Sequence, residues 1–176
     1  MKHGVGTRAK RCGAVAALSL VLVAASSAAG ADRTGMGTAP ALLEPNVRRG
    51  FKPAVVLKIR LGFHLAMTRA GTVPQCGALF LDLGASPVEL LGRSRYFPAA
   101  LNRGNPSCAN RELAFAHFGS PVVWVCDAFK DLSAEEAAMA LIHEALHSAG
   151  LWEQPHDPQA MTSREIDHLV KSRCTH

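Results

Sequence analysis

This chain of 176 residues has few aromatic residues and, once its first segment is set aside, almost no net charge. Residues 1–31 carry four of the 19 lysines and arginines and no acidic residue, which leaves 15 basic against 14 acidic residues, a net charge of about +1. The remainder has no basic patch with interleaved aromatics, so the composition does not favour nucleic acid as a partner. The sequence also has no internal repeat and no C-x-x-C pair of the kind that binds zinc.

The apolar run near the N-terminus is too short to cross a bilayer comfortably. Basic residues precede this run from Gly13 to Ala25, small residues follow it, and Ala29-Gly30-Ala31 fits an A-x-A cleavage site, with Ser26-Ser27-Ala28 as the other option. No cysteine stands directly after the run, where a lipoprotein would need one. We therefore predict a signal peptide over residues 1–31, a secreted or periplasmic location, and no membrane association after the signal is removed.

Four cysteines remain after residues 1–31, an even number in an oxidising compartment, so two disulfides are expected. Of the three possible pairings we favour Cys126 with Cys174 and Cys76 with Cys108. The first of these bonds would tie the last predicted helix to the strand that precedes the helix carrying the motif described below. The remaining length of about 145 residues suits one domain with a modest core.

The pattern of apolar residues predicts a small, single-domain α/β (α+β) fold. Residues 32–53 are rich in Gly, Pro and Ala without an apolar period, so we expect a flexible lead-in before a domain over 54–176. Helical patterns cover 54–69, 75–83, a segment starting at Ser86-Pro87, 134–146, and a last segment with Ser163 as its N-cap. Strand patterns cover 93–99, 111–118 and 121–126, and a turn at Gly119-Ser120 separates the last two. Residues 57–61 also alternate like a strand, and the length of the 54–69 segment decides for a helix.

The helix predicted over 134–146 has the clearest boundaries. Ser133 is a good N-cap, two glutamates follow in the first turn where the helix dipole favours acids, and Gly150 fits a left-handed C-cap. The residues between these ends are mostly strong helix formers. The next motif therefore falls on a helix.

His143 and His147 lie four residues apart, so their imidazoles point from the same face of this helix. Zn²⁺ binds neutral His nitrogens readily, prefers tetrahedral geometry, and in catalytic sites keeps one position open for water. Glu144, the residue after the first His, then lies beside that water as a candidate base. An H-E-x-x-H match arises by chance in roughly 2 of 100 chains of this composition, so chance is a poor explanation.

Residues 143–153 read H-E-x-x-H-x-x-G-x-x-E, and Met161 follows downstream. This pattern resembles that of the metzincin zinc metalloproteases, H-E-x-x-H-x-x-G-x-x-H with a downstream Met-turn, over roughly the last 45 residues. The resemblance implies a zincin-like metallohydrolase domain over 54–176 with a catalytic Zn²⁺. Position 153 holds Glu where that pattern has His, and a carboxylate is also an accepted zinc ligand.

Three residues compete as the third metal ligand beside the two histidines. Glu153 is favoured because Gly150 permits the chain reversal and because the spacing is that of the metzincin-like pattern. Glu165 would supply a carboxylate from the next helix, although the helix dipole already explains an acid in its first turn. His156 suits zinc chemically but comes three residues later than the pattern requires.

The function expected from these residues is an exported zinc-dependent hydrolase, in first place a metallopeptidase acting on a peptide or protein substrate. The strand at 121–126, or its neighbour, could pair with an extended peptide. Two alternatives stay open: a zinc amide hydrolase acting on cell-wall material, and an inactive zincin-like module that binds a partner. The sequence does not indicate an oligomeric state.

Overall fold

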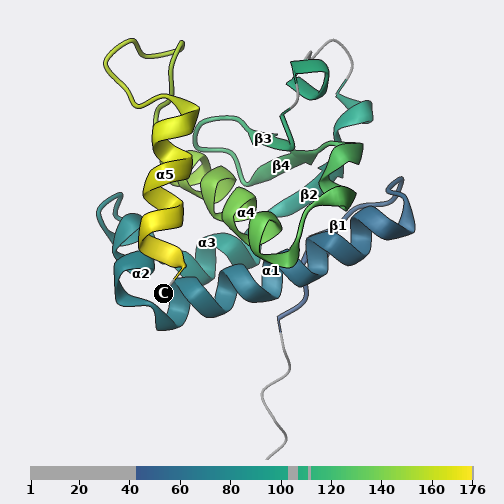
Figure 1. Ribbon diagram of the computed structural model, residues 1–176, viewed down its shortest axis with the longest axis horizontal. Helices are drawn as coiled ribbons and strands as arrows, with labels where there is room; N and C mark the ends of the chain where they lie inside the picture. Colours follow the sequence, from purple (N-terminus) through teal and green to yellow (C-terminus); the bar gives the residue numbers. More distant parts are fainter. Residues whose placement is uncertain (1–42, 103–106, 111, 176) are drawn as a thin grey trace, which may run out of the picture. The chain divides into compact units, whose positions relative to one another are not determined.

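The described part of this computed structural model, residues 43–102, 107–110 and 112–175, contains five α-helices and a four-stranded mixed sheet (Figure 1). The helices are α1 (Pro53–Thr72), α2 (Pro74–Leu81), α3 (Pro87–Arg93), α4 (Ala134–Ala149) and α5 (Ser163–Cys174). The strands are β1 (Asn46–Val47), β2 (Arg95–Pro98), β3 (Ala114–Ala116) and β4 (Val122–Val125). The predicted α+β class is confirmed, and the predicted signal peptide lies outside the described residues. No helix of this part of the chain is both long and apolar enough to span a membrane.

The sheet has the strand order β1-β2-β4-β3, in which β1, β2 and β4 are parallel and β3 runs antiparallel to β4. Tyr96 lies opposite Val123, which in turn lies opposite Ala116, on the face that is buried against the helices. Trp124 points to the other face, because successive side chains of a strand alternate. The predicted hairpin of β3 and β4 is present, and β3 is left as an edge of the sheet.

The predicted flexible lead-in over residues 32–53 is corrected at its second half. Asn46 and Val47 form β1 and pair in parallel with Arg95 and Tyr96 of β2. A strand of two residues has no alternation that sequence patterning can detect, which is why it was not expected. Residues 32–42 lie outside the described part of the chain.

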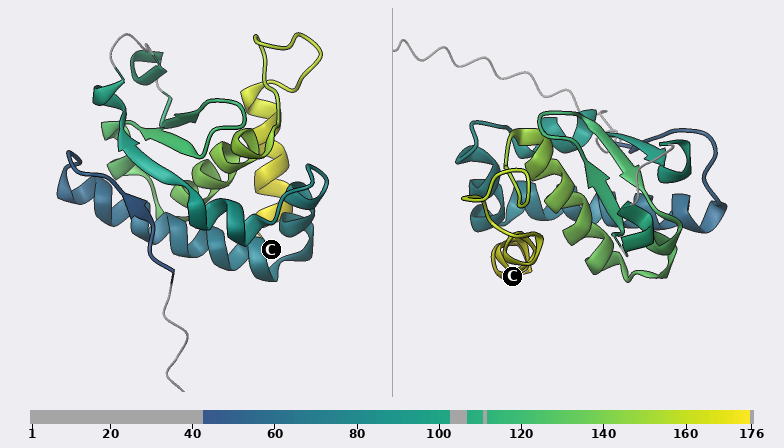
Figure 2. Two further views of the ribbon diagram at one scale, coloured as in Figure 1. Left: turned by 180° about the vertical axis from the view of Figure 1, so that it is seen from behind. Right: turned by 90° about the horizontal axis from the view of Figure 1, so that it is seen from above.

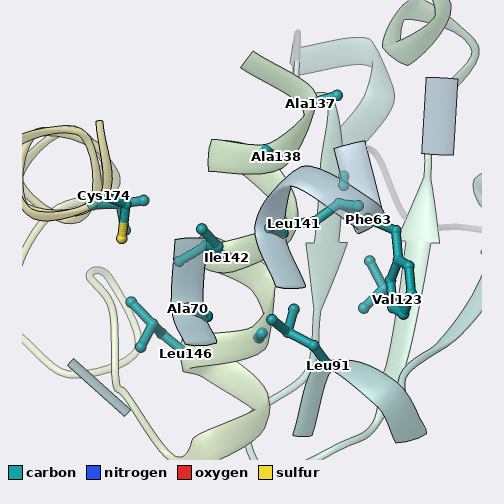
Figure 3. Close-up of a cluster of buried hydrophobic side chains, with 14 of the residues drawn as sticks. Phe63, Ala70, Leu91, Val123, Ala137, Ala138, Leu141, Ile142, Leu146 and Cys174 are labelled. Atoms are coloured by element: carbon teal, nitrogen blue, oxygen red, sulfur yellow. The ribbon is translucent and has the colours of Figure 1, made fainter. Parts of the chain in front are cut away.

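Helix α4 is the central helix and contacts α1, α3, α5 and β3. Figure 3 shows its apolar side chains, including Leu141 and Ile142, among side chains of α1, α3 and β4. Gly62 of α1 permits the close crossing, because a Cβ atom there would lie 2.7 Å from the Cβ atom of Ala137. Two views in Figure 2 show α1 running beneath both α4 and the sheet. The core therefore fixes α4 from several sides.

The ends of α4 agree with the sequence, whereas the start of α5 is shifted by one residue. Ser133 forms a capping box with Glu136, and Gly150 ends α4 with a φ of 110°. The N-cap of α5 is Thr162 and not Ser163, because the Thr162 side chain accepts the backbone N–H of Glu165. The Glu165 carboxylate in turn accepts the backbone N–H of Thr162.

Two disulfides form, but the favoured pairing was wrong. Cys76 of α2 is bonded to Cys174 at the end of α5, and Cys108 is bonded to Cys126, with Cα–Cα distances of 4.7 and 5.7 Å. The reason is tertiary packing: α5 lies against α2, so its last residue meets that helix and not the end of β4. Cysteine spacing alone cannot reveal such a contact.

Candidate metal centre

Two histidines of α4 and one glutamate beyond its C-terminus point their ligating atoms at one another. His143 and His147 are 6 % and 7 % exposed, and their Nε2 atoms are 3.0 Å apart. The chain reverses at Gly150 and brings back Glu153, whose Oε2 atom lies 2.8 Å from His147 Nε2 and 3.5 Å from His143 Nε2. These three residues form a group that could hold a metal ion.

The separations within this group fit a tetrahedral cation. With metal–ligand bonds of about 2.0 to 2.1 Å, two ligand atoms of a tetrahedral centre lie about 3.3 Å apart. The three observed separations of 2.8, 3.0 and 3.5 Å bracket that distance. The donor set of two imidazole nitrogens and one carboxylate oxygen is one that zinc accepts.

The second nitrogen of each imidazole is held by an acceptor. His147 Nδ1 lies 2.8 Å from the carbonyl oxygen of Leu151, and His143 Nδ1 lies 2.7 Å from Oδ1 of Asp167. A carbonyl oxygen can only accept, so Nδ1 of His147 carries the proton and donates it, and a carboxylate imposes the same on His143. The neutral imidazoles then direct their Nε2 lone pairs at each other and at the Glu153 carboxylate. Such a cluster of acceptors needs a positive group at its centre.

The pKa shifts of His143 and Glu153 both favour a positive charge at the centre of this group. Burial alone would lower the pKa of His143, but hydrogen bonds with Asp167 and Glu153 and the nearby charge of Glu144 raise it to about 10. Burial acts to raise the pKa of Glu153, yet the two histidines lower it overall. Without a cation, a proton on His143 supplies the missing charge.

Glu144 is buried beside this group with half of its carboxylate unsatisfied. Burial raises its pKa to about 7, partly offset by the charge of His143 and by a hydrogen bond from the backbone N–H of Ala116. Its Oε2 atom has no hydrogen-bond partner among the described residues. A carboxyl group in this state can take up and release a proton near neutral pH.

The group lies in a cleft of about 490 Å³ that the edge strand β3, α4, the segment after α4 and the start of α5 enclose. Cys126 donates its backbone N–H to the carbonyl of Leu113, so these two residues form a hydrogen-bonded pair of the antiparallel ladder. By the alternation of such ladders, the backbone groups of Ala114 and Ala116 point away from β4. The Ala116 N–H donates a hydrogen bond to the Glu144 carboxylate. The carbonyl oxygen of Ala116 faces the free edge of the sheet.

The structure separates the three candidates for the third ligand position. Glu153 belongs to the group, and its backbone pairs with Met161, whose side chain packs against the core. The Glu165 carboxylate is exposed and binds Thr162 at the start of α5. His156 lines the cleft but is exposed, and its ring is not part of the ligand group.

Sequence reasoning missed four contributors to the site: Asp167, the carbonyl of Leu151, the N–H of Ala116, and the aromatic pair of Phe118 and Trp152. Asp167 follows the inward-facing Ile166 on α5, yet no spacing rule connects it to a histidine 24 residues earlier. The backbone groups carry no sequence pattern at all.

Comparisons with protein-family models, curated proteins and solved structures found no match to this chain. The resemblance to the metzincin pattern therefore rests on residues 143–153 and Met161 alone.

Proposed function

We propose that this protein is an exported zinc-dependent hydrolase, and that its substrate is a peptide or protein. One observation carries the proposal: three ligating atoms, from His143, His147 and Glu153, converge in a cleft beside the buried carboxylate of Glu144. Two imidazoles and one carboxylate are the protein ligands of one class of catalytic zinc site, which leaves a coordination position open. A zinc ion held there would polarise a substrate carbonyl and make water more acidic.

The residues around the ligands favour a catalytic over a purely structural role. Asp167 and the carbonyl of Leu151 hold the two imidazoles in the tautomer and orientation that a metal requires. Glu144 is not one of the three converging residues, and its Oε2 atom, which has no partner in the described part of the chain, is available for proton transfer. We infer that Glu144 takes a proton from the attacking water and passes it to the leaving amine.

The edge strand β3 supports a peptide substrate. The strand lines the cleft, and the outward backbone groups of Ala114 and the carbonyl oxygen of Ala116 offer hydrogen bonds to an extended chain, since the Ala116 N–H is bonded to Glu144. A peptide paired there would lie along the cleft that holds the three ligands. The two disulfides are compatible with an exported protein, since such bonds persist in oxidising compartments.

The test is a broad peptide-library cleavage assay on the exported protein after removal of residues 1–31. We expect cleavage by the zinc-loaded protein, loss of cleavage with a chelator, and recovery when zinc is added back. Hydrolysis of cell-wall amides without cleavage of any peptide would replace the peptidase by the amide hydrolase. No turnover of either substrate by fully loaded protein would favour the inactive binding module.

A further inference from the structure

Two aromatic side chains form an exposed stack at the rim of the cleft. The ring centroids of Phe118 and Trp152 are 4.0 Å apart, with an interplanar angle of 16°. The residues are 48 % and 46 % exposed, and both line the cleft that contains the ligand group. Large apolar groups left half in water beside a candidate active site are typical of a binding surface.

The position of the stack is fixed relative to the ligand group. Trp152 stands between Leu151, whose carbonyl holds His147, and Glu153. Phe118 follows β3, and the next residue, Gly119, donates its backbone N–H to the carbonyl of His147. The Phe118 ring also lies against Gly150, with two ring atoms 3.7 Å from where a Cβ atom would be. The stack is therefore anchored at the end of α4 that carries His147.

The stack also lies on the path that a peptide bound to β3 would take. An extended chain paired with Ala114 and Ala116 reaches Phe118 within two residues, about 7 Å along a strand. Alternate side chains of that peptide share one side, so the one that reaches Phe118 can contact the two rings. A bulky apolar side chain would remove the exposed ring surface from water, and an aromatic one would add ring–ring contact.

We propose that the Phe118–Trp152 stack selects a bulky apolar side chain, above all an aromatic one, next to the scissile bond of a peptide substrate. This inference rests on the proposed peptidase function. Acidic side chains fit the position poorly, because Glu153 and Asp167 already place carboxylates in the same cleft. The class of substrate is thus a peptide with an aromatic or large aliphatic residue beside the cleaved bond.

A binding experiment tests the inference without turnover. Blocked five-residue peptides that differ only at the central position (Phe, Leu, Ala or Glu) are titrated into zinc-loaded Glu144→Gln protein by calorimetry. We expect the Phe peptide to bind about 10-fold or more tightly than the Ala peptide, and the Glu peptide to bind most weakly. In the same protein carrying Phe118→Ala and Trp152→Ala, the Phe and Ala peptides should bind equally. If a chitin-type oligosaccharide binds more tightly than every peptide, the stack binds a sugar ring and the proposal is overturned.

A kinetic experiment separates selectivity from general damage. Trp152→Ala and Phe118→Ala should each lower kcat/KM about 10- to 100-fold on peptides with Phe beside the cleaved bond, and little on the Ala counterparts. Trp152→Phe should recover most of the loss, and Leu81→Ala, a change at an exposed apolar residue of α2 outside the cleft, should have no effect. Metal content is measured for each variant.

Each outcome of these experiments decides one of the two proposals. If the parent cleaves no peptide, the peptidase function itself fails. If the parent cleaves peptides without aromatic preference, only the proposed selectivity of the Phe118–Trp152 stack fails. The same holds if the variants keep their full metal content and cleave Phe and Ala peptides more slowly to the same degree. Loss of metal in both Trp152→Ala and Phe118→Ala would assign the stack a structural role and also overturn it.

Discussion

The two sides of α4 are buried to nearly the same extent but are held by different forces. On one side Ala138 and Ile142 are 0 % exposed and pack in the hydrophobic core. On the other side His143, Glu144 and His147 are 6 to 7 % exposed and carry polar groups. The first side needs only apolar atoms of suitable volume, whereas each buried polar group on the second side needs a specific hydrogen-bond or ionic partner.

This difference distinguishes the candidate site on α4 from the side that contributes to the core. Partners for the polar side come from three separate segments: Ala116 of β3, the residues after Gly150, and Asp167 of α5. Among the residues that the structure describes, the Glu144 Oε2 atom has no hydrogen-bond partner, and the Nε2 atoms of the two histidines face each other and the Glu153 carboxylate. These converging ligand atoms form a group that could hold a metal ion.

The largest effect is expected from an isosteric change on the polar side. Glu144→Gln keeps the shape of the side chain but removes its ability to take a proton, so kcat should fall about 10²- to 10⁴-fold. Zinc content should stay near that of the parent, because Glu144 is not part of the ligand group. Kinetics and metal analysis of the same preparation check both statements. Full activity in the variant would exclude the proposed role of Glu144.

Loss of the third ligand should weaken zinc binding in a way that loss of a neighbouring acid does not. Glu153→Ala is expected to lower zinc affinity by more than about 100-fold, beyond the range typical of residues behind the ligands. Glu165→Ala is the matched control: it removes a capping carboxylate of α5 and should lower the thermal midpoint without changing zinc affinity. Competition titration with a chromogenic chelator measures both variants. The opposite result would transfer the ligand role to Glu165.

On the apolar side, a cavity should reduce stability and leave the metal site intact. Leu141→Ala removes most of a side chain that is 1 % exposed, so the free energy of unfolding should fall by about 2 to 5 kcal/mol. Chemical denaturation of the metal-free protein measures this change. Zinc affinity of the folded variant should match that of the parent. A large loss of zinc affinity here would show that the two sides of α4 are not separable.

A smaller effect is expected at the residue that holds His143. Asp167→Ala removes the acceptor for the Nδ1 proton, and zinc affinity should fall about 10- to 100-fold. Asp82→Ala changes another acid of the same charge, the residue directly after α2, and is expected to have no effect. Titration calorimetry with zinc distinguishes the two. Equal affinities for Asp167→Ala and the parent would remove Asp167 from the site.

The smallest expected effect, about tenfold for each pH unit, is on the pH dependence of zinc binding. In the metal-free protein the pKa of His143 is raised to about 10 from 6.5, so its proton stabilises the fold below pH 6.5, and this contribution is lost as pH rises through 10. Zinc must displace that proton, so its affinity should rise about tenfold per pH unit between pH 6.5 and 8.5. Calorimetry in buffers of different ionisation enthalpy counts the released proton. Affinity independent of pH would contradict the account of His143.

The sequence predicted the parts of this molecule that local chemistry determines. Ser133 and Gly150 mark the ends of α4, and the spacing of His143 and His147 places both on one side of it. The spacing and the chain reversal at Gly150 favour Glu153 as the third ligand, and the fold brings it to the two histidines. These features depend on residues that are close together in the chain.

The features that the sequence did not predict depend on contacts between distant segments. The pairing of Cys76 with Cys174 follows from the packing of α2 against α5, and Asp167 reaches His143 for a similar reason. The stack of Phe118 and Trp152 joins the end of a hairpin to the loop after α4. The two-residue strand β1 exists only because β2 is there to pair with it.

Metal analysis of the protein without residues 1–31 is the most direct test of the proposal that the polar side of α4 binds a catalytic cation. We predict about one zinc per chain in the parent, and none in a His143→Ala, His147→Ala double variant that has the same fold by circular dichroism. Parent protein that takes up no zinc, or a double variant that binds zinc as tightly as the parent, would contradict it.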